Sequence, residues 1–298
     1  DERGALARAV VVPDDYLPAH RALGLYPITA FAARNGIHGL HRQVRETFDT
    51  PLRGLPRAGT LEHFAPDAGP PGARPALPYD LSDSLGLRPT RIGASHLAEL
   101  LAHHAPVLEV DVAGSDDRPG RPYLDASGAG AVDTAEPLAY SYARVMPFDG
   151  ELRLQLVYVF WFDARPRRGP VDTLAGDVDG LVWRVTLDRS GRPLLYDSIH
   201  PCGCYHQFFP SDDLLLRTQA LDRPEPPLVP AVAPRVQEGE RIVLRVESGT
   251  HYLQRVYTTR TAADVPVTRY AQRPYRELYR VPASGTQRSF FFFFFLLP

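Results

Sequence analysis

The stretch from Leu152 to Phe162 constrains the fold most, because both of its alternating faces become apolar. Leucine, tyrosine or phenylalanine occupies every second position of this run, and after Arg153 the positions between them also become largely apolar. Successive side chains of a strand point to opposite faces, so a strand with two apolar faces has to be covered on both sides. We therefore predict a central strand here, paired through the Asp149-Gly150 turn with a strand at Leu138–Val145.

Two further hairpins are predicted after this strand. One joins 181–188 to 193–200 through a turn at Arg189–Arg192, and the other joins 241–247 to 252–260 and has His251 near its tip. Before them, residues 14–49 carry apolar residues at the spacing of three to four that is typical of a helix, and a short helix is predicted from Ser95.

These elements predict an α+β protein, with an antiparallel β-sheet or sandwich and helices packed from the N-terminal part. The expected domains are a helical and proline-rich region at 1–104, a β-rich domain at 105–265 and an irregular tail at 266–298. Prolines are frequent at 50–92, which predicts an irregular excursion there, and 261–288 is expected to be irregular as well.

The overall composition limits the partners of this chain. The formal charge is −2 and all 33 basic residues are arginine, which argues against nucleic acid as a partner. No run of about 18 apolar residues is present, so no transmembrane span is expected. The apolar tail from Phe290 is an expected assembly element, and the partner is otherwise an unknown small molecule or protein. The chain starts at Asp1 without methionine, which favours a processed secreted or periplasmic protein, with a fragment as the alternative.

Chemistry is concentrated at 197–206, which holds both cysteines of the chain. His200, Cys202, Cys204 and His206 alternate, so an extended strand would place them in one row. A bend at Gly203 would bring them together, because glycine adopts turn conformations readily. Thiolate and imidazole ligands suit zinc, copper and iron, and we expect a transition-metal site with zinc as the first choice.

Three alternatives compete with the metal site. Cys202 and Cys204 could form a disulfide or a dithiol redox pair. One cysteine could act as a nucleophile activated by His200 or His206. The cysteines could also be small buried hydrophobes, with the histidines bonded to backbone.

An acidic loop with Asp177 and Asp179 enters the first strand of the 181–200 hairpin. Antiparallel pairing places these carboxylates near His200 to Cys204, where one of them could orient a ligand or act as general base to a metal-bound water. We therefore predict a metal-binding protein, in particular a metal-dependent hydrolase. The alternatives are a structural or interaction subunit of a larger assembly and a thiol redox protein.

The blocks Asp179–Leu187 and Asp197–His206 resemble a block in uncharacterised bacterial proteins, a resemblance that brings no activity with it. More distantly, the strand order of residues 138–206 is similar to that of the necrosis- and ethylene-inducing protein family. That family is a β-sandwich with a metal site in an acidic His/Asp/Glu loop. The corresponding loop here, 176–180, holds Asp177 and Asp179 but no histidine. The resemblance therefore implies a metal near these carboxylates and no cytolytic role.

Overall fold

The computed structural model describes residues 26–69, 71–77, 92–167, 169, 175–215, 226–260 and 266–280, and for 26–35 and 280 the backbone alone. The described part is mostly β. The helical elements are α3 (Tyr26–Asp49), η1 (Leu52–Gly54), α4 (Ala94–His103), η3 (Ser115–Asp117) and η5 (Tyr275–Arg280). The strands are β1 (Thr60–Pro66), β2 (Val107–Val112), β3 (Arg121–Leu124), β4 (Gly130–Asp133), β5 (Leu138–Phe148), β6 (Glu151–Phe162), β7 (Asp179–Leu187), β8 (Pro193–Ile199), β9 (Gln207–Pro210), β10 (Glu240–Val246), β11 (Leu253–Arg260) and β12 (Val267–Pro274).

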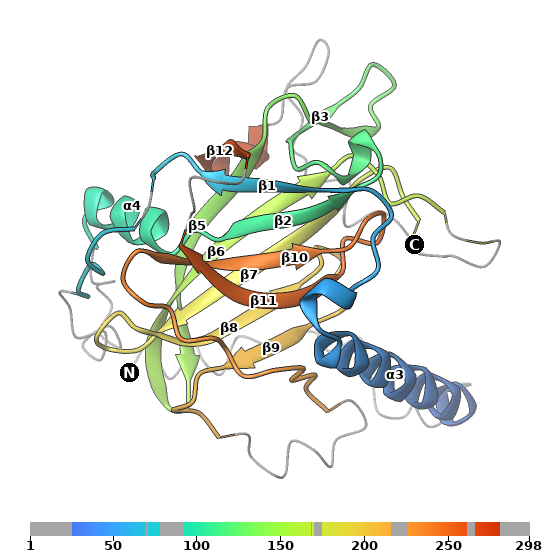
Figure 1. Ribbon diagram of the computed structural model, residues 1–298, viewed down its shortest axis with the longest axis horizontal. Coiled ribbons are helices and arrows are strands. Elements are labelled where there is room, and N and C mark those ends of the chain that lie inside the picture. Colours follow the sequence, from blue (N-terminus) through green and yellow to red (C-terminus); the bar gives the residue numbers. More distant parts are fainter. Residues whose placement is uncertain are drawn as a thin grey trace, which may run out of the picture.

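One ten-stranded sheet organises the molecule, in the order β11-β10-β2-β1-β12-β5-β6-β7-β8-β9. The sheet curls, so that β1, β2, β10 and β11 lie across β6 to β8 (Figure 1). Three of its pairings are parallel: β10 with β2, β1 with β12, and β12 with β5. The expectation of an α+β protein with an antiparallel sheet is therefore wrong: the sheet is mixed, and the described residues contain two α-helices.

The error has a physical cause. Parallel pairing joins strands that are far apart in the sequence and leaves no hairpin signal. β1 follows closely after Pro56 and ends at Pro66, inside a stretch expected to be irregular, and β12 lies inside the segment 261–288 expected to be irregular. The sheet thus takes β1 from the predicted N-terminal region and β12 from the predicted tail.

The elements that local pattern predicts do form. β6 is the central strand between β5 and β7, and both of its faces are covered. Leu156, Tyr158 and Phe160 face the main core, whereas Val157 and Trp161 pack with β3, β4 and η5 on the other side. The predicted hairpins are confirmed as β7–β8 and β10–β11.

A buried ionic cluster holds the parallel part of the sheet in register. Glu109 of β2 accepts hydrogen bonds from Arg245 of β10 (2.9 Å) and the Tyr257 hydroxyl of β11 (2.8 Å), and it lies 3.0 Å from the His63 ring of β1. Burial alone would raise the pKa of Glu109, but these partners lower it to about 2. The cluster links four neighbouring strands through one carboxylate.

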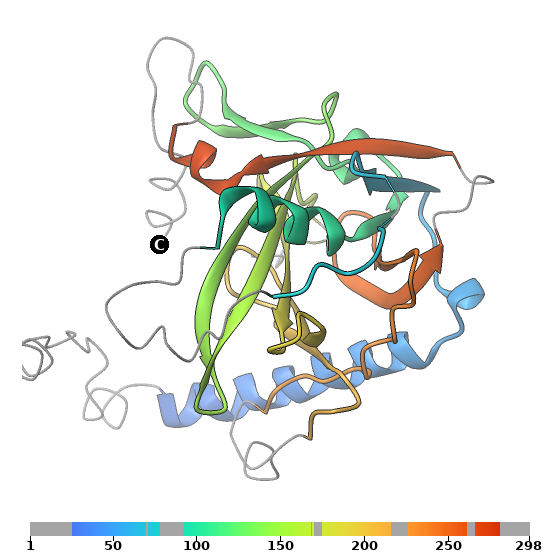
Figure 2. The same ribbon diagram turned by 90° about the vertical axis from the view of Figure 1, so that its left-hand side faces the viewer.

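The two α-helices close opposite ends of the curled sheet (Figures 1 and 2). At the end of α3, Phe48 packs on Phe209 of β9, and Arg255 of β11 donates to the Thr47 carbonyl. The helix therefore bridges both edge strands. α4 is fixed by the Tyr158 hydroxyl, which donates to the Leu101 carbonyl. No helix in the described ranges is long and apolar enough to cross a membrane. The tail from Phe290 lies outside the described residues.

The position of β1 inside the sheet predicts a large effect of Phe64→Ala. Phe64 is fully buried in the main core, and truncating such a phenylalanine costs about 3–5 kcal/mol of unfolding free energy. Urea unfolding measures this loss, with the exposed Leu52→Ala as control. A change within about 0.5 kcal/mol for Phe64→Ala, as expected of a surface residue, would place β1 outside the core.

Candidate functional site

The predicted site residues lie at one end of the sheet, where β6 and β8 end and β7 begins. The turn after β8 is closed by two backbone hydrogen bonds, from the Gly203 N–H to the His200 carbonyl (2.8 Å) and from the His200 N–H to the Cys204 carbonyl (3.1 Å). Gly203 has a φ of +87°, so the predicted bend at this glycine is confirmed. The turn packs closely on Gly180 of β7, where an added Cβ would come within 2.8 Å of the Pro201 ring.

Asp179 contacts two histidines at the start of β7. Its Oδ1 lies 3.3 Å from His200 Nδ1, and its Oδ2 lies 2.8 Å from His251 Nδ1. The predicted closeness of Asp179 to the turn after β8 is confirmed. Asp179 also accepts the Gly180 N–H at 2.8 Å, so the same carboxylate shapes the entry into the strand. Asp177, by contrast, is exposed and takes no part in these contacts.

His251 extends these contacts to a second carboxylate. It is fully buried, its ring stacks on Phe162 at 4.0 Å, and its Nε2 lies 3.4 Å from Asp117 Oδ1. Its φ of +52° is a left-handed conformation, which histidine adopts more readily than most residues. We call Asp117, His251, Asp179 and His200 the Asp–His chain.

Backbone and hydroxyl donors fix the far end of the Asp–His chain. Asp117 accepts N–H groups of Ala113 (2.8 Å), Gly114 (3.2 Å) and Gly249 (2.6 Å), and the Ser248 hydroxyl (2.9 Å). Because β2 and β10 run parallel, the loops that follow them leave the sheet at the same end. Topology therefore brings Asp117 to the turn that carries His251.

The electrostatics of the Asp–His chain favour an ionised state. Burial alone would raise the pKa of Asp117 and Asp179, but the neighbouring histidines, and for Asp117 also backbone N–H donors, hold both pKa values well below the usual range. Burial alone would lower the pKa of His251, but its two carboxylate partners raise it above 6.5. A cation between two carboxylates is the arrangement that allows all three groups to be buried.

Aromatic rings cover His200. Tyr205 and Tyr252 lie 3.9 Å apart, and their centroids are 5.5 Å and 5.4 Å from the His200 ring. Arg165 donates to the Tyr252 hydroxyl at 3.2 Å and lies over its ring. His200 is therefore almost fully buried, beneath a lid of two tyrosines.

The two cysteines are free; Cys202 is exposed and Cys204 half-buried. They lie close enough together for Cys204 to influence the pKa of Cys202. The pKa of Cys202 is raised to about 11, first because the turn partly desolvates the thiol and then because Cys204 and Asp179 lie nearby. Nucleophilic cysteines have lowered pKa values, so this environment opposes a cysteine activated by histidine.

The four predicted metal ligands are not gathered at one point. The Nε2 of His206 lies 3.0 Å from Asp197 and 2.7 Å from Arg184, and its ring packs on Phe208. In the part of the chain that the structure describes, no group of three or more His, Cys, Asp or Glu residues could hold a metal ion. The described site joins His200 to Asp179 and Cys202 to Cys204 instead.

Sequence patterns missed two members of the site, Asp117 and His251. His251 was expected at a separate hairpin tip, yet it contacts Asp179 directly. Neither residue shares a short sequence motif with Asp179 or His200, because each comes from a loop distant in sequence. The one available hint was the Gly114-Ser115-Asp116-Asp117 turn directly after a buried strand.

Comparison with known proteins gives a distant structural similarity to the necrosis- and ethylene-inducing protein family. One solved structure, described as "NLPPya in complex with mannosamine", is 14% identical, with 75% of this chain and 90% of that chain covered and a TM-score of 0.31. A second, described as "Toxin fold for microbial attack and plant defense", is 15% identical, covering 76% and 91%, with a TM-score of 0.32. No family model and no curated protein matches the sequence. Scores this low support no inference about activity.

The raised pKa of His251 predicts a pH-dependent stability. A histidine with a raised folded pKa contributes stability that is fully present below about pH 6.5 and is lost as pH rises through the folded value. Asp117 has a lowered pKa, so its contribution is present above about pH 4 and is lost at lower pH. We expect His251→Asn, which keeps the left-handed turn, to lower the unfolding free energy more at pH 5.5 than at pH 8.5.

Urea unfolding of both proteins at the two pH values measures this difference. His96→Asn on α4 is the control, because His96 pairs with Glu99 of the same helix and its loss leaves the Asp–His chain intact. An equal loss at pH 5.5 and 8.5 for His251→Asn would mean that His251 is not charged between its carboxylates.

Proposed function

We propose that the protein binds one thiophilic metal ion through Cys202 and Cys204. The observation that supports the proposal is the closeness of the two thiols on a turn closed by two backbone hydrogen bonds. Thiolate–metal bonds of ~2.3 Å put two sulfurs about 3.7 Å apart at a tetrahedral ion and about 4.6 Å apart at a linear one. Two neighbouring thiols of one turn therefore need little movement to hold the same ion.

The charge beneath the turn favours a cation over free thiolates. Asp179 contributes to the raised pKa of Cys202, which means that its negative charge opposes ionisation of the thiol. A bound cation reverses this balance, because it neutralises the thiolates and is itself attracted by the carboxylate. The same carboxylate holds His200 through Nδ1, as carboxylates commonly orient metal-binding imidazoles.

The ion that suits such a pair is copper(I). Zinc sites usually have three or four protein ligands, and no such group is assembled among the described residues. Soft thiolate ligands select copper(I), which is satisfied by fewer donors. The hydrolytic activity expected from the sequence stays a prediction.

A thiol redox pair is the second candidate, because the same contact would allow a Cys202–Cys204 disulfide. Its formation needs a disulfide oxidant. One cysteine thiolate attacks the oxidant, forms a mixed disulfide and releases the first reduced thiol. The second cysteine then attacks the protein sulfur of the mixed disulfide and releases the other reduced thiol. A pKa of about 11 leaves about one Cys202 thiol in ten thousand ionised at pH 7, so the attack is slow. This kinetic disadvantage makes metal binding the better-supported function.

The metal proposal predicts different effects for neighbouring residues. Copper(I) is titrated anaerobically into the reduced protein in competition with a chromophoric chelator. We expect one equivalent to bind, and Cys202→Ser or Cys204→Ser to weaken binding at least 100-fold, since a hydroxyl is a poor soft-metal ligand. His206→Ala is the matched control, because His206 contacts Arg184 and Asp197 instead, and it should retain the affinity of the parent protein.

Two results would decide against the metal site. One is equal copper binding by the parent protein and both serine variants, with their folds intact by circular dichroism. The other is a protein that binds no copper(I) and is rapidly oxidised by glutathione disulfide, losing the two thiol hydrogens. That result would favour the redox pair.

A further inference from the structure

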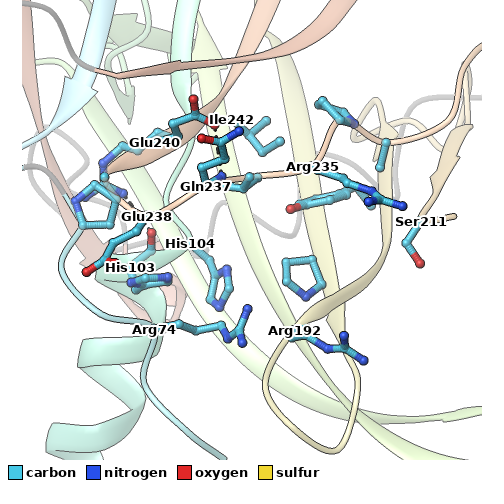
Figure 3. A pocket seen from close by; sticks show the side chains of 18 of the residues that line it. Arg74, His103, His104, Arg192, Ser211, Arg235, Gln237, Glu238, Glu240 and Ile242 are labelled. Carbon is cyan, nitrogen blue, oxygen red and sulfur yellow. Dashed lines mark hydrogen bonds between the residues drawn. The ribbon is translucent and has the colours of Figure 1, made fainter. Parts of the chain in front are cut away.

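A cavity of about 630 Å³ lies away from the cysteine turn, between the end of α4, the start of β8 and the segment before β10 (Figure 3). Its size falls in the range of roughly 300–1,000 Å³ that is common for small-molecule sites. Prolines and small apolar residues form part of its wall: Pro71, Pro193, Ala233, Pro234, Val236 and Ile242. Neither the proposed metal site nor the Asp–His chain uses this cavity.

Two buried nitrogen atoms in the cavity wall have no hydrogen-bond partner among the described residues. They are Nε2 of His104 and Nε of Arg241. Leaving a buried polar group unpaired costs free energy, so an occupant that supplies acceptor oxygens at this place would remove that cost. Figure 3 shows His104 beside Arg74, with the guanidinium of Arg74 close to the imidazole ring.

The buried end of the cavity is positively charged. Arg241 is almost fully buried and donates to four carbonyl oxygens, of Gly69, Ala102, His103 and Ala105, with no carboxylate partner among the described residues. Arg74, which is an exposed residue, adds a second charge beside His104 and forms no ion pair with a described residue. The pKa of His104 is lowered to about 3, mainly by burial. The nearby charges of Arg74 and Arg241 also contribute to this shift.

The acidic residues of the wall do not cancel this charge. Asp212 pairs with Arg235 at 2.7 Å, and Glu240 accepts the Gln237 N–H at 3.0 Å. Asp213 and Glu238 are exposed at the rim, where water weakens their field. Arg192 is balanced by Asp188, which lies outside the cavity. A negative group is therefore best accommodated beside Arg74, His104 and Arg241, with the neutral body of the ligand against the apolar wall.

We propose that this cavity binds a small organic anion, with its carboxylate or phosphate group between Arg74 and His104. Arginine supplies parallel N–H donors that match such oxygens, and the neutral imidazole supplies one more through Nε2. The apolar proline walls would contact the body of the ligand.

Benzoate and phenyl phosphate test the proposal on the whole chain, with benzamide as the neutral analogue. Calorimetric titration should show binding of at least one of the two anions and at least tenfold weaker binding of benzamide. The stronger of the two anions identifies the head group, carboxylate or phosphate. Arg74→Gln and His104→Phe, which remove a donor but keep the bulk, should each weaken anion binding about tenfold or more.

Arg189→Gln is the matched control, because Arg189 is exposed on the β7–β8 turn, pairs with Glu151 and does not line the cavity. It should bind the anion as the parent protein does. The proposal is overturned by no binding of either anion, by equal binding of benzamide, or by unchanged affinity of a folded Arg74→Gln protein. If Arg189→Gln lost as much anion affinity as Arg74→Gln, the effect would be one of general surface charge, and the proposal would also be overturned.

Discussion

The loop end of this molecule depends on His251, whose ring lies between the carboxylates of Asp117 and Asp179. The two carboxylates raise the pKa of this imidazole, and the protonated ring is the form that allows both of them to stay ionised. Asp179 then has its second oxygen left for His200. The turn that carries both cysteines is thus anchored, through one carboxylate, to the loops after β2 and β10.

The curled mixed sheet makes this convergence necessary. Parallel pairing of β10 with β2 sends their following loops to one end, and antiparallel pairing of β6, β7 and β8 brings the end of β6, the start of β7 and the end of β8 to the same end. Curling lays the two groups of strands across each other, so Phe162 of β6 stacks on His251. At the other end, α4 and Arg241 close the sheet around a cavity whose buried part is positive. The proposed cation site and the proposed anion site therefore lie at different ends of the sheet.

Local pattern predicted what depends on neighbouring residues. The alternation around Leu156 and Phe160 identified the central strand, and the turn at Ser190-Gly191 identified the hairpin that places Asp179 beside His200. The contact of Asp179 with His251 and the pairing of the parallel strands depend on residues 70 to more than 200 positions apart, for which alternation carries no signal. His206 illustrates the limit: its spacing from Cys204 suggested a shared ligand set, but strand β9 begins directly after it and its ring nitrogen contacts Arg184 and Asp197.

The proposed metal binding at the cysteine turn would account for three features of that turn. They are its bend, its two neighbouring thiols and the carboxylate beneath them, all of which a bound cation would use. X-ray absorption at the copper edge of the protein loaded with one equivalent of copper(I) tests this most directly, since it reports the elements bonded to the metal. The account predicts a first coordination shell with two sulfur scatterers, from Cys202 and Cys204. A first shell of nitrogen and oxygen alone would contradict it.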